Sequence, residues 1–182
     1  RLPEGVNEIS IQIDTEDGTG GLAEEILIAR QTGDFSNVPV EINPDIHRLL
    51  INIANKEYAQ LLREVLDPSN RPMVFHCSHG IHRTGTATAL LLSILGVPWE
   101  TIREDYLLSN TYRKEEVEHR LVQLRELAAK NQGIAPEEVD MTNTNAFYIL
   151  EGKYIDAALD ESNVGRYSYL LKDFSYIAQF VV

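Results

Sequence analysis

The spacing between one cysteine and one arginine suits chemistry on a phosphate group. Five residues separate Cys77, the only cysteine of the chain, from Arg83. An apolar run before the cysteine (73–75) and an alanine- and leucine-rich segment after the arginine predict a strand, a tight loop and a helix. Such a loop directs backbone N–H groups and the positive end of the helix at one point, which suits a tetrahedral oxyanion. We therefore expect Cys77 to have a lowered pKa and to be nucleophilic near neutral pH.

Each residue of this loop has an expected task. The guanidinium of Arg83 can direct two N–H groups at two phosphate oxygens. Gly80 stands where the chain must curl without a side chain, and Thr84 places a hydroxyl within reach of the sulfur. The residues expected to contact the phosphate are Ser78, His79, Gly80, Ile81, His82, Arg83 and Thr84. Histidines at 76, 79 and 82 suggest a metal, but side chains diverge in a phosphate loop, so we expect neither a metal nor another cofactor.

The loop resembles the signature of the cysteine-dependent protein tyrosine phosphatases, in which His-Cys is followed, after five residues, by Arg and then Ser or Thr. The matching residues are His76, Cys77, Gly80, Arg83 and Thr84. Segments 95–98 and 105–110 are similar to the bacterial branch of that family, and the resemblance extends loosely over residues 38–175. It implies a metal-independent hydrolase that acts on phosphotyrosine, with dual specificity as an alternative, through a cysteinyl-phosphate intermediate.

The loop departs from the bacterial branch at two positions. That branch usually has Gly-Lys-Asp-Arg where this chain has Gly80-Ile81-His82-Arg83. The missing lysine removes a cation that would favour highly charged inositol phosphates, and the missing aspartate removes a proposed general acid. Two alternative functions follow. An inositol-phosphate phosphatase can share this loop, although Ile81 and the acidic net charge disfavour it; a catalytically impaired phosphate-binding module would fit the two departures.

Phosphoester cleavage also needs a proton donor for the leaving group. In the family that the loop resembles, the donor is an aspartate that follows a proline on a mobile loop upstream of the cysteine. Asp45 likewise follows a proline and lies 32 residues before Cys77. Alternatively, Asp45 only stabilises the first turn of a helix. His82, which stands where the bacterial branch has aspartate, is the rival donor. Asp67 and Asp105 are weaker candidates.

The length and the net charge of the chain limit its domain organisation and its partners. A chain of 182 residues suits one phosphatase domain over residues 1–182, and its start at Arg1 indicates a processed protein or a fragment that lacks an N-terminal segment. A net charge of -12 disfavours nucleic acid and stable association with an anionic membrane. We expect a phosphorylated protein or a small phosphomonoester as partner. One cysteine and no long apolar run predict a soluble protein, cytoplasmic rather than secreted.

The residue patterns predict an α/β fold, with a small, mostly parallel central sheet flanked by helices and the cysteine loop at the carboxyl end of a strand. Alternation over 9–13 indicates a half-buried strand, and 38–42 a short further one. Asn43 is the expected N-cap of a long helix. The predicted helices cover 22–31, 43–66, 84–95, 98 onward, 111–130, 146–159 and 167–173. Tyrosines of residues 140–182 are expected in the core, with 174–182 packed on the domain.

Overall fold

The structure, a computed structural model, describes residues 4–13 and 22–159. The elements in chain order are α1 (Leu22–Thr32), α2 (Ile42–Ile53), α3 (Asn55–Leu66), the short 3-10 turn η2 (Pro68–Asn70), α4 (His82–Ile94), α5 (Trp99–Tyr112), α6 (Lys114–Gln132), η3 (Pro136–Glu138), α7 (Thr142–Tyr148) and α8 (Gly152–Asp156). None of the helices in the described ranges is long and apolar enough to cross a membrane.

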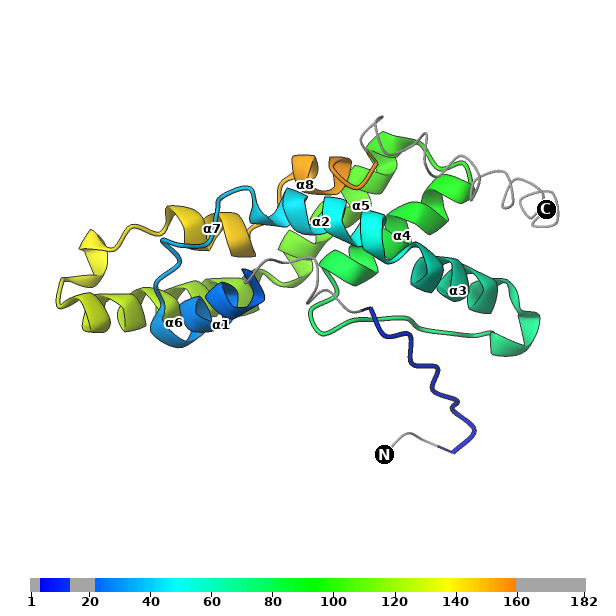
Figure 1. Ribbon diagram of the computed structural model, residues 1–182, viewed down its shortest axis with the longest axis horizontal. Coiled ribbons are helices and arrows are strands. Elements are labelled where there is room, and N and C mark those ends of the chain that lie inside the picture. Colours follow the sequence, from blue (N-terminus) through cyan, green and yellow to red (C-terminus); the bar gives the residue numbers. More distant parts are fainter. Residues whose placement is uncertain (1–3, 14–21, 160–182) are drawn as a thin grey trace.

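The helices pack around α2, which contacts α3, α4, α7 and α8. Helix α5 packs against α4 and α8, and α1 lies along α6. Figure 1 shows α1, α6 and α7 together at one end of the molecule, with α3 toward the other. The loop that carries the cysteine leads into α4 and therefore joins the bundle beside α2 and α5.

The predicted central sheet is wrong, because residues 4–13 and 22–159 contain no β-strand. Residues 9–13 have no strand beside them, and Ile9 is 46% exposed. The segment before the cysteine is irregular too, with Val74 88% exposed. A strand is stabilised by backbone hydrogen bonds to a neighbouring strand. Apolar alternation without such a neighbour leaves these segments irregular.

The second predicted strand, 38–42, is instead a turn that leads into α2. The N–H of Val38 donates to the carbonyl of Phe35 at 2.9 Å, and the N–H of Ile42 donates to that of Pro39 at 3.1 Å. Val38 and Ile42 are fully buried, whereas Val40 is 41% exposed. The two buried side chains, Val38 and Ile42, are thus four residues apart. They fix the turn against the core just where α2 begins.

Most helix predictions are confirmed, with bounds shifted by a few residues; these are 22–31, 84–95, 98 onward and 111–130. The helix predicted over 43–66 is split, because α2 ends at Ile53 and α3 begins at Asn55. The side chain of Asn52 donates to the carbonyl of Arg48 at 2.8 Å. Asparagine side chains compete in this way with helical backbone bonds, and the two asparagines around Ala54 are the sequence signal for the break.

The predicted helix 146–159 is likewise two short helices, α7 and α8. Tyr148 and Tyr154 are buried, which confirms that these tyrosines belong to the core. The predicted helix 167–173, its tyrosines and the apolar segment 174–182 lie outside the described residues.

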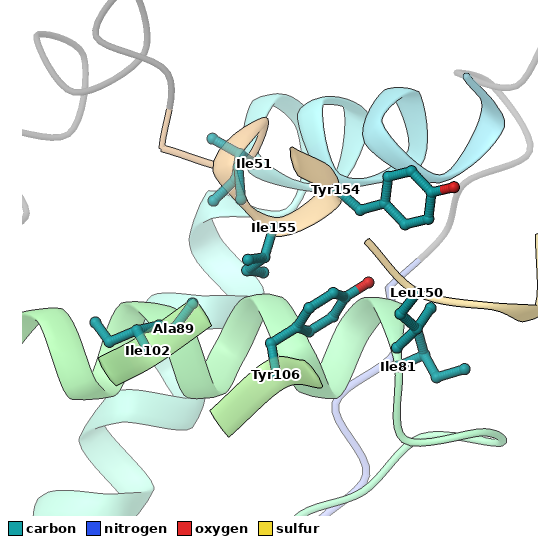
Figure 2. Packing of buried hydrophobic residues seen from close by; sticks show 9 residues of the cluster. Ile51, Ile81, Ala89, Ile102, Tyr106, Leu150, Tyr154 and Ile155 are labelled. Atoms are coloured by element: carbon teal, nitrogen blue, oxygen red, sulfur yellow. The ribbon is translucent and has the colours of Figure 1, made fainter. Parts of the chain in front are cut away.

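A core cluster beside the cysteine loop joins α2, α4, α5 and α8, as Figure 2 shows. Its members are Ile51, Ile81, Ala89, Ile102, Tyr106, Leu150, Tyr154, Ile155 and Ala158. Ile81 immediately precedes α4 and is 6% exposed. Full burial of an isoleucine side chain contributes about 2 kcal/mol. The loop is therefore anchored at its end by an apolar side chain.

Helix α1 is followed by a residue that lies so close to the backbone of α6 that only glycine fits there. Gly33 has a φ of +79°, and a Cβ there would stand 2.6 Å from the backbone nitrogen of Ala128. Gly96 after α4 has a similar φ of +75°, but a Cβ there would meet nothing within 4 Å. The two glycines therefore differ in steric contact and not in backbone conformation.

Gly33→Ala should destabilise the protein more than Gly96→Ala. We expect a loss of roughly 1 kcal/mol at Gly96, from the left-handed backbone alone. At Gly33 we expect about 2 to 4 kcal/mol, because the new methyl group must also displace α6. Urea unfolding followed by circular dichroism measures both losses. Equal losses would contradict the close approach of α1 and α6.

Candidate active site

The chain before α4 curls around the sulfur of Cys77. Gly80 has a φ of +71°, a conformation that favours glycine. Its backbone N–H donates to Sγ of Cys77 at 3.2 Å. His76 supports the loop, with Nδ1 3.1 Å from the carbonyl oxygen of Cys77. Because α4 begins at His82, the sulfur lies close to a helix N-terminus, where negative charge is stabilised.

Hydrogen bonds set the acidity of the thiol. Partial burial is the largest single influence and raises the pKa of Cys77. The hydroxyl and N–H of Thr84, together with the N–H groups of His79 and Gly80, lower it by more in total. The resulting pKa is about 7, against an ordinary value of 9.0. A large share of the cysteine is therefore thiolate at neutral pH, the form that attacks electrophiles.

The other loop residues differ in exposure. Ser78, His79 and Arg83 are exposed, and Thr84 is half-buried. The Arg83 side chain makes no ion pair within the described part of the chain. Its carbonyl oxygen accepts a hydrogen bond from Oη of Tyr58 at 3.4 Å. The guanidinium can therefore serve an anion without breaking an ion pair to a described residue.

The loop is attached to α2 and α7 through a buried asparagine. Asn43 is fully buried, and its Nδ2 donates to the carbonyl oxygens of Ala146 and Phe147, at 2.7 and 3.2 Å. Its Oδ1 lies 2.6 Å from Nε2 of His82. Because the amide hydrogens point at carbonyls, Oδ1 is the acceptor and Nε2 of His82 is the donor. The prediction that Asn43 caps α2 is wrong, since α2 begins at Ile42 and the side chain links three elements.

A second buried residue of α2 holds the same part of α4. His47 is fully buried, with Nδ1 2.9 Å from Oγ1 of Thr86 and Nε2 3.1 Å from Oη of Tyr106. Its ring centroid lies 5.5 Å from those of both His82 and Tyr106. Burial, with a smaller effect of His82, lowers the pKa of His47 to about 3, so the ring is neutral.

The prediction from sequence missed these supporting residues, which are Asn43, His47, Thr86 and Tyr106. One signal could have found two of them. Asn43 and His47 are four residues apart, and the apolar residues Ile46 and Leu50 of the same helix pack into the core. A polar residue repeated on the buried side of a helix needs a polar partner. The sequence does not show that α4 and α5 supply that partner.

The three histidines of the loop have separate partners. His76 lies against a backbone carbonyl, His79 has Nδ1 3.2 Å from Oγ of Ser78, and His82 bonds to Asn43. Residues 4–13 and 22–159 hold no group of three or more His, Cys, Asp or Glu side chains suited to a metal ion.

The two candidate proton donors from the sequence lie in different surroundings. Asp45 is exposed, and its Oδ1 is 2.8 Å from Nη1 of Arg48. It stands two residues after Asn43 and two before His47, so it faces away from the side of α2 that meets α4. His82 lies in the loop, but it donates its Nε2 proton to Asn43. Burial, with smaller effects of neighbouring positive charges, lowers the pKa of His82 to about 4.

A further carboxylate borders the loop. A cavity of about 60 Å³ between α4 and α5 is lined in part by Gly80, Thr88, Asp105 and Ser109, and it is large enough for water. Asp105 therefore shares this space with the loop glycine. Asp67 instead holds η2, where its Oδ1 accepts the N–H of Ser69 at 2.8 Å.

Comparison with known proteins gives the class of the chain. Residues 2–172 match the tyrosine phosphatase family, so the chain belongs to that family, and the resemblance of the loop is confirmed. A stretch of 43 residues is 40% identical to inositol diphosphatase DSP2 of rice, Oryza sativa subsp. japonica. That stretch is 24% of this chain and only 21% of the relative's length. No solved structure matches the chain.

The acidity of Cys77 is directly measurable. The rate of alkylation by iodoacetamide should rise with pH and be half-maximal near pH 7, because the thiolate is the reactive form. Thr84→Val should move that midpoint upward by about one pH unit, since it removes a hydrogen bond to a charged group. Thr84→Ser, which keeps the hydroxyl, is the matched control. A midpoint near pH 9 in the wild type would contradict the hydrogen-bonded thiolate.

Proposed function

We propose that the chain hydrolyses phosphomonoesters through a covalent phosphate on Cys77. The observation that carries the proposal is the hydrogen-bonded sulfur beside the N-terminus of α4, with a thiol pKa of about 7. Membership of the tyrosine phosphatase family supports the same reaction class.

In the first step, Sγ of Cys77 attacks the phosphorus atom. A sulfur–phosphorus bond forms while the bond from phosphorus to the leaving oxygen breaks, and the leaving oxygen takes a proton from a general acid. The loop N–H groups and the guanidinium of Arg83 bind the equatorial oxygens, where negative charge is held in the transition state. The backbone of the loop from Ser78 to Thr84 provides these donors.

In the second step, water attacks the phosphorus of the intermediate. The sulfur–phosphorus bond breaks, inorganic phosphate leaves, and the thiolate is regenerated. The group that donated the first proton accepts one from the attacking water. The Thr84 hydroxyl stabilises the departing thiolate, because it hydrogen-bonds to the sulfur and lowers the thiol pKa.

The proposed substrate class is phosphotyrosine, with dual specificity as the alternative within that class, and it rests on the family. A second candidate is an inositol phosphate, because a matched relative is named an inositol diphosphatase. That match is confined to 43 residues, and Ile81 stands where a loop lysine would favour highly charged substrates.

Proton transfer is proposed for a carboxylate and not for His82. The Nε2 proton of His82 is donated to Asn43, and its pKa of about 4 leaves the ring neutral at pH 7. Asp45 would have to leave Arg48 and turn toward the loop. Asp105 already borders a cavity shared with Gly80. We therefore propose Asp105 as the proton donor, with Asp45 as the alternative.

Hydrolysis of para-nitrophenyl phosphate tests the thiol mechanism. The wild type should be active in the presence of a chelator, and Cys77→Ser should lower kcat by at least about a thousandfold. Arg83→Lys should lower kcat/KM by about a hundredfold, because an ammonium cannot form the two-pronged contact. Arg125→Gln changes an exposed arginine of α6 and serves as the control.

An unchanged rate in Cys77→Ser would disprove the mechanism. A wild type that binds vanadate without turning over any phosphomonoester would identify a phosphate-binding module instead. Faster phosphate release from inositol phosphates than from a phosphotyrosine peptide would select the second substrate class.

The pH profile tests the proton donor. A general acid must be protonated to act, so kcat of the wild type should fall as pH rises above the pKa of that acid. Asp105→Asn should lower kcat by about a hundredfold and remove this basic limb, whereas Asp45→Asn and His82→Gln should keep it. The measurement is kcat for para-nitrophenyl phosphate from acidic to neutral pH. Loss of the limb in Asp45→Asn alone would assign the proton to Asp45.

A further inference from the structure

The cavity between α4 and α5 is lined by three polar side chains that have no partner in the described part of the chain. They are Thr88 of α4 and Asp105 and Ser109 of α5. None of these side chains forms a hydrogen bond or an ion pair with a described residue. The nearby hydroxyl of Thr86, in contrast, lies 2.9 Å from Nδ1 of His47. The three side chains can therefore bond to a molecule inside the cavity.

The two helices bring these side chains to one space. Asp105 and Ser109 are four residues apart and therefore lie on the same face of α5. Thr88 lies three residues after Gly85 on α4, and both line the cavity. A Cβ at Gly85 would stand 3.1 Å from the ring of Tyr106, so the helices are in close contact beside the cavity. The missing side chain at Gly85 thus lets α5 come near enough for Asp105 and Ser109 to share a space with Thr88.

The size and the lining of the cavity suit water. Its volume of about 60 Å³ exceeds the roughly 10 to 15 Å³ that one water molecule requires, and it is far below the roughly 300 Å³ of a pocket for an organic ligand. One side is apolar and consists of the buried residues Ala89, Ile102 and Tyr106, which belong to the core cluster of Figure 2. Asp105 is the one charged residue among the described residues that line the cavity. Water there is held from the other side by the three polar side chains.

The cavity reaches the phosphate loop at Gly80. This residue also lines the cavity, and its N–H donates to Sγ of Cys77 at 3.2 Å. A Cβ at Gly80 would meet nothing within 4 Å, so there is open space at this point of the loop. The side chain of Asp105 bonds no residue of the loop directly. A general acid that does not reach its target by itself can act through one water molecule.

We propose that this cavity is a water site and that Thr88 and Ser109 are positioning residues, which act through its water on the carboxyl group of Asp105. The proposal rests on the proposed function, in which Asp105 is the proton donor. In the first step, the held water gives one proton to the leaving oxygen while it takes the proton of the Asp105 carboxyl. In the second step, the attacking water loses a proton to the held water, which returns one to the Asp105 carboxylate. The held water is therefore unchanged over the cycle.

A high-resolution crystal structure of the full chain tests the water site itself. The wild type should show ordered water within hydrogen-bond distance of Thr88, Ser109 and the Asp105 carboxylate. Thr88→Val replaces the hydroxyl with a methyl group and should displace that water while the helices stay in place. A wild-type cavity without ordered water would overturn the proposal. This measurement needs no turnover, so a protein that hydrolyses no phosphomonoester would reject the proposed function and leave the test of the water site valid.

Hydrolysis of phenyl phosphate tests the role of the water, because the phenolate that leaves must be protonated. Thr88→Val should lower kcat about tenfold and leave KM within about twofold, since proton transfer is impaired and phosphate binding is not. Thr88→Ser, which keeps the hydroxyl, should recover most of kcat. Thr101→Val changes an exposed threonine of α5 that does not line the cavity, and it should retain the kcat of the wild type.

A double-mutant cycle separates this role from a structural one. Because the water acts only through Asp105, Thr88→Val should cause no further loss of kcat in an Asp105→Asn background. An about tenfold loss in both backgrounds would overturn the positioning role. An equal loss in Thr101→Val, or an unchanged kcat in Thr88→Val, would overturn it too. Thermal unfolding of each variant shows whether the compared proteins are equally folded.

Discussion

The candidate site depends on holding a short loop so that its N–H groups converge on one sulfur. In the described residues no sheet provides this support. It comes from two buried polar residues of α2, Asn43 and His47, one turn apart. Asn43 bonds His82, and His47 bonds Thr86, so α2 holds the first turns of α4 by hydrogen bonds of 2.6 and 2.9 Å. Buried polar groups of this kind are costly unless paired, and therefore they specify one arrangement of the helices.

The same loop balances two opposing effects on Cys77. Burial alone would raise the thiol pKa and suppress the nucleophile, while the donors of Thr84, His79 and Gly80 favour the charged form. The donors prevail only while the backbone keeps its curl, which requires the positive φ of Gly80. The pKa of the thiol thus depends on the conformation of the loop. The contacts that anchor His82 and Ile81 therefore support both.

Local residue order predicted the helix after Arg83 and the curl at Gly80, but little of what holds them in place. The helix after Arg83 could be predicted because its apolar residues follow the loop directly in sequence, whereas the strand predicted before Cys77 is not present. The absence of a sheet in the described residues could not be predicted. Apolar residues over 9–13 and 38–42 have the same pattern whether or not a neighbouring strand exists. The role of Asn43 was also out of reach. Its partners at His82 and Ala146 lie 39 and 103 residues away along the chain.

The two departures from the bacterial loop pattern both face inward. Ile81 packs in the core with Ala89 and Tyr106, and His82 bonds Asn43, so both positions hold the loop where a lysine and an aspartate would offer charge to a ligand. A loop of this kind has fewer cations of its own. Binding of an anion in this loop would therefore rely on the guanidinium of Arg83, the N–H groups of the loop and the N-terminus of α4.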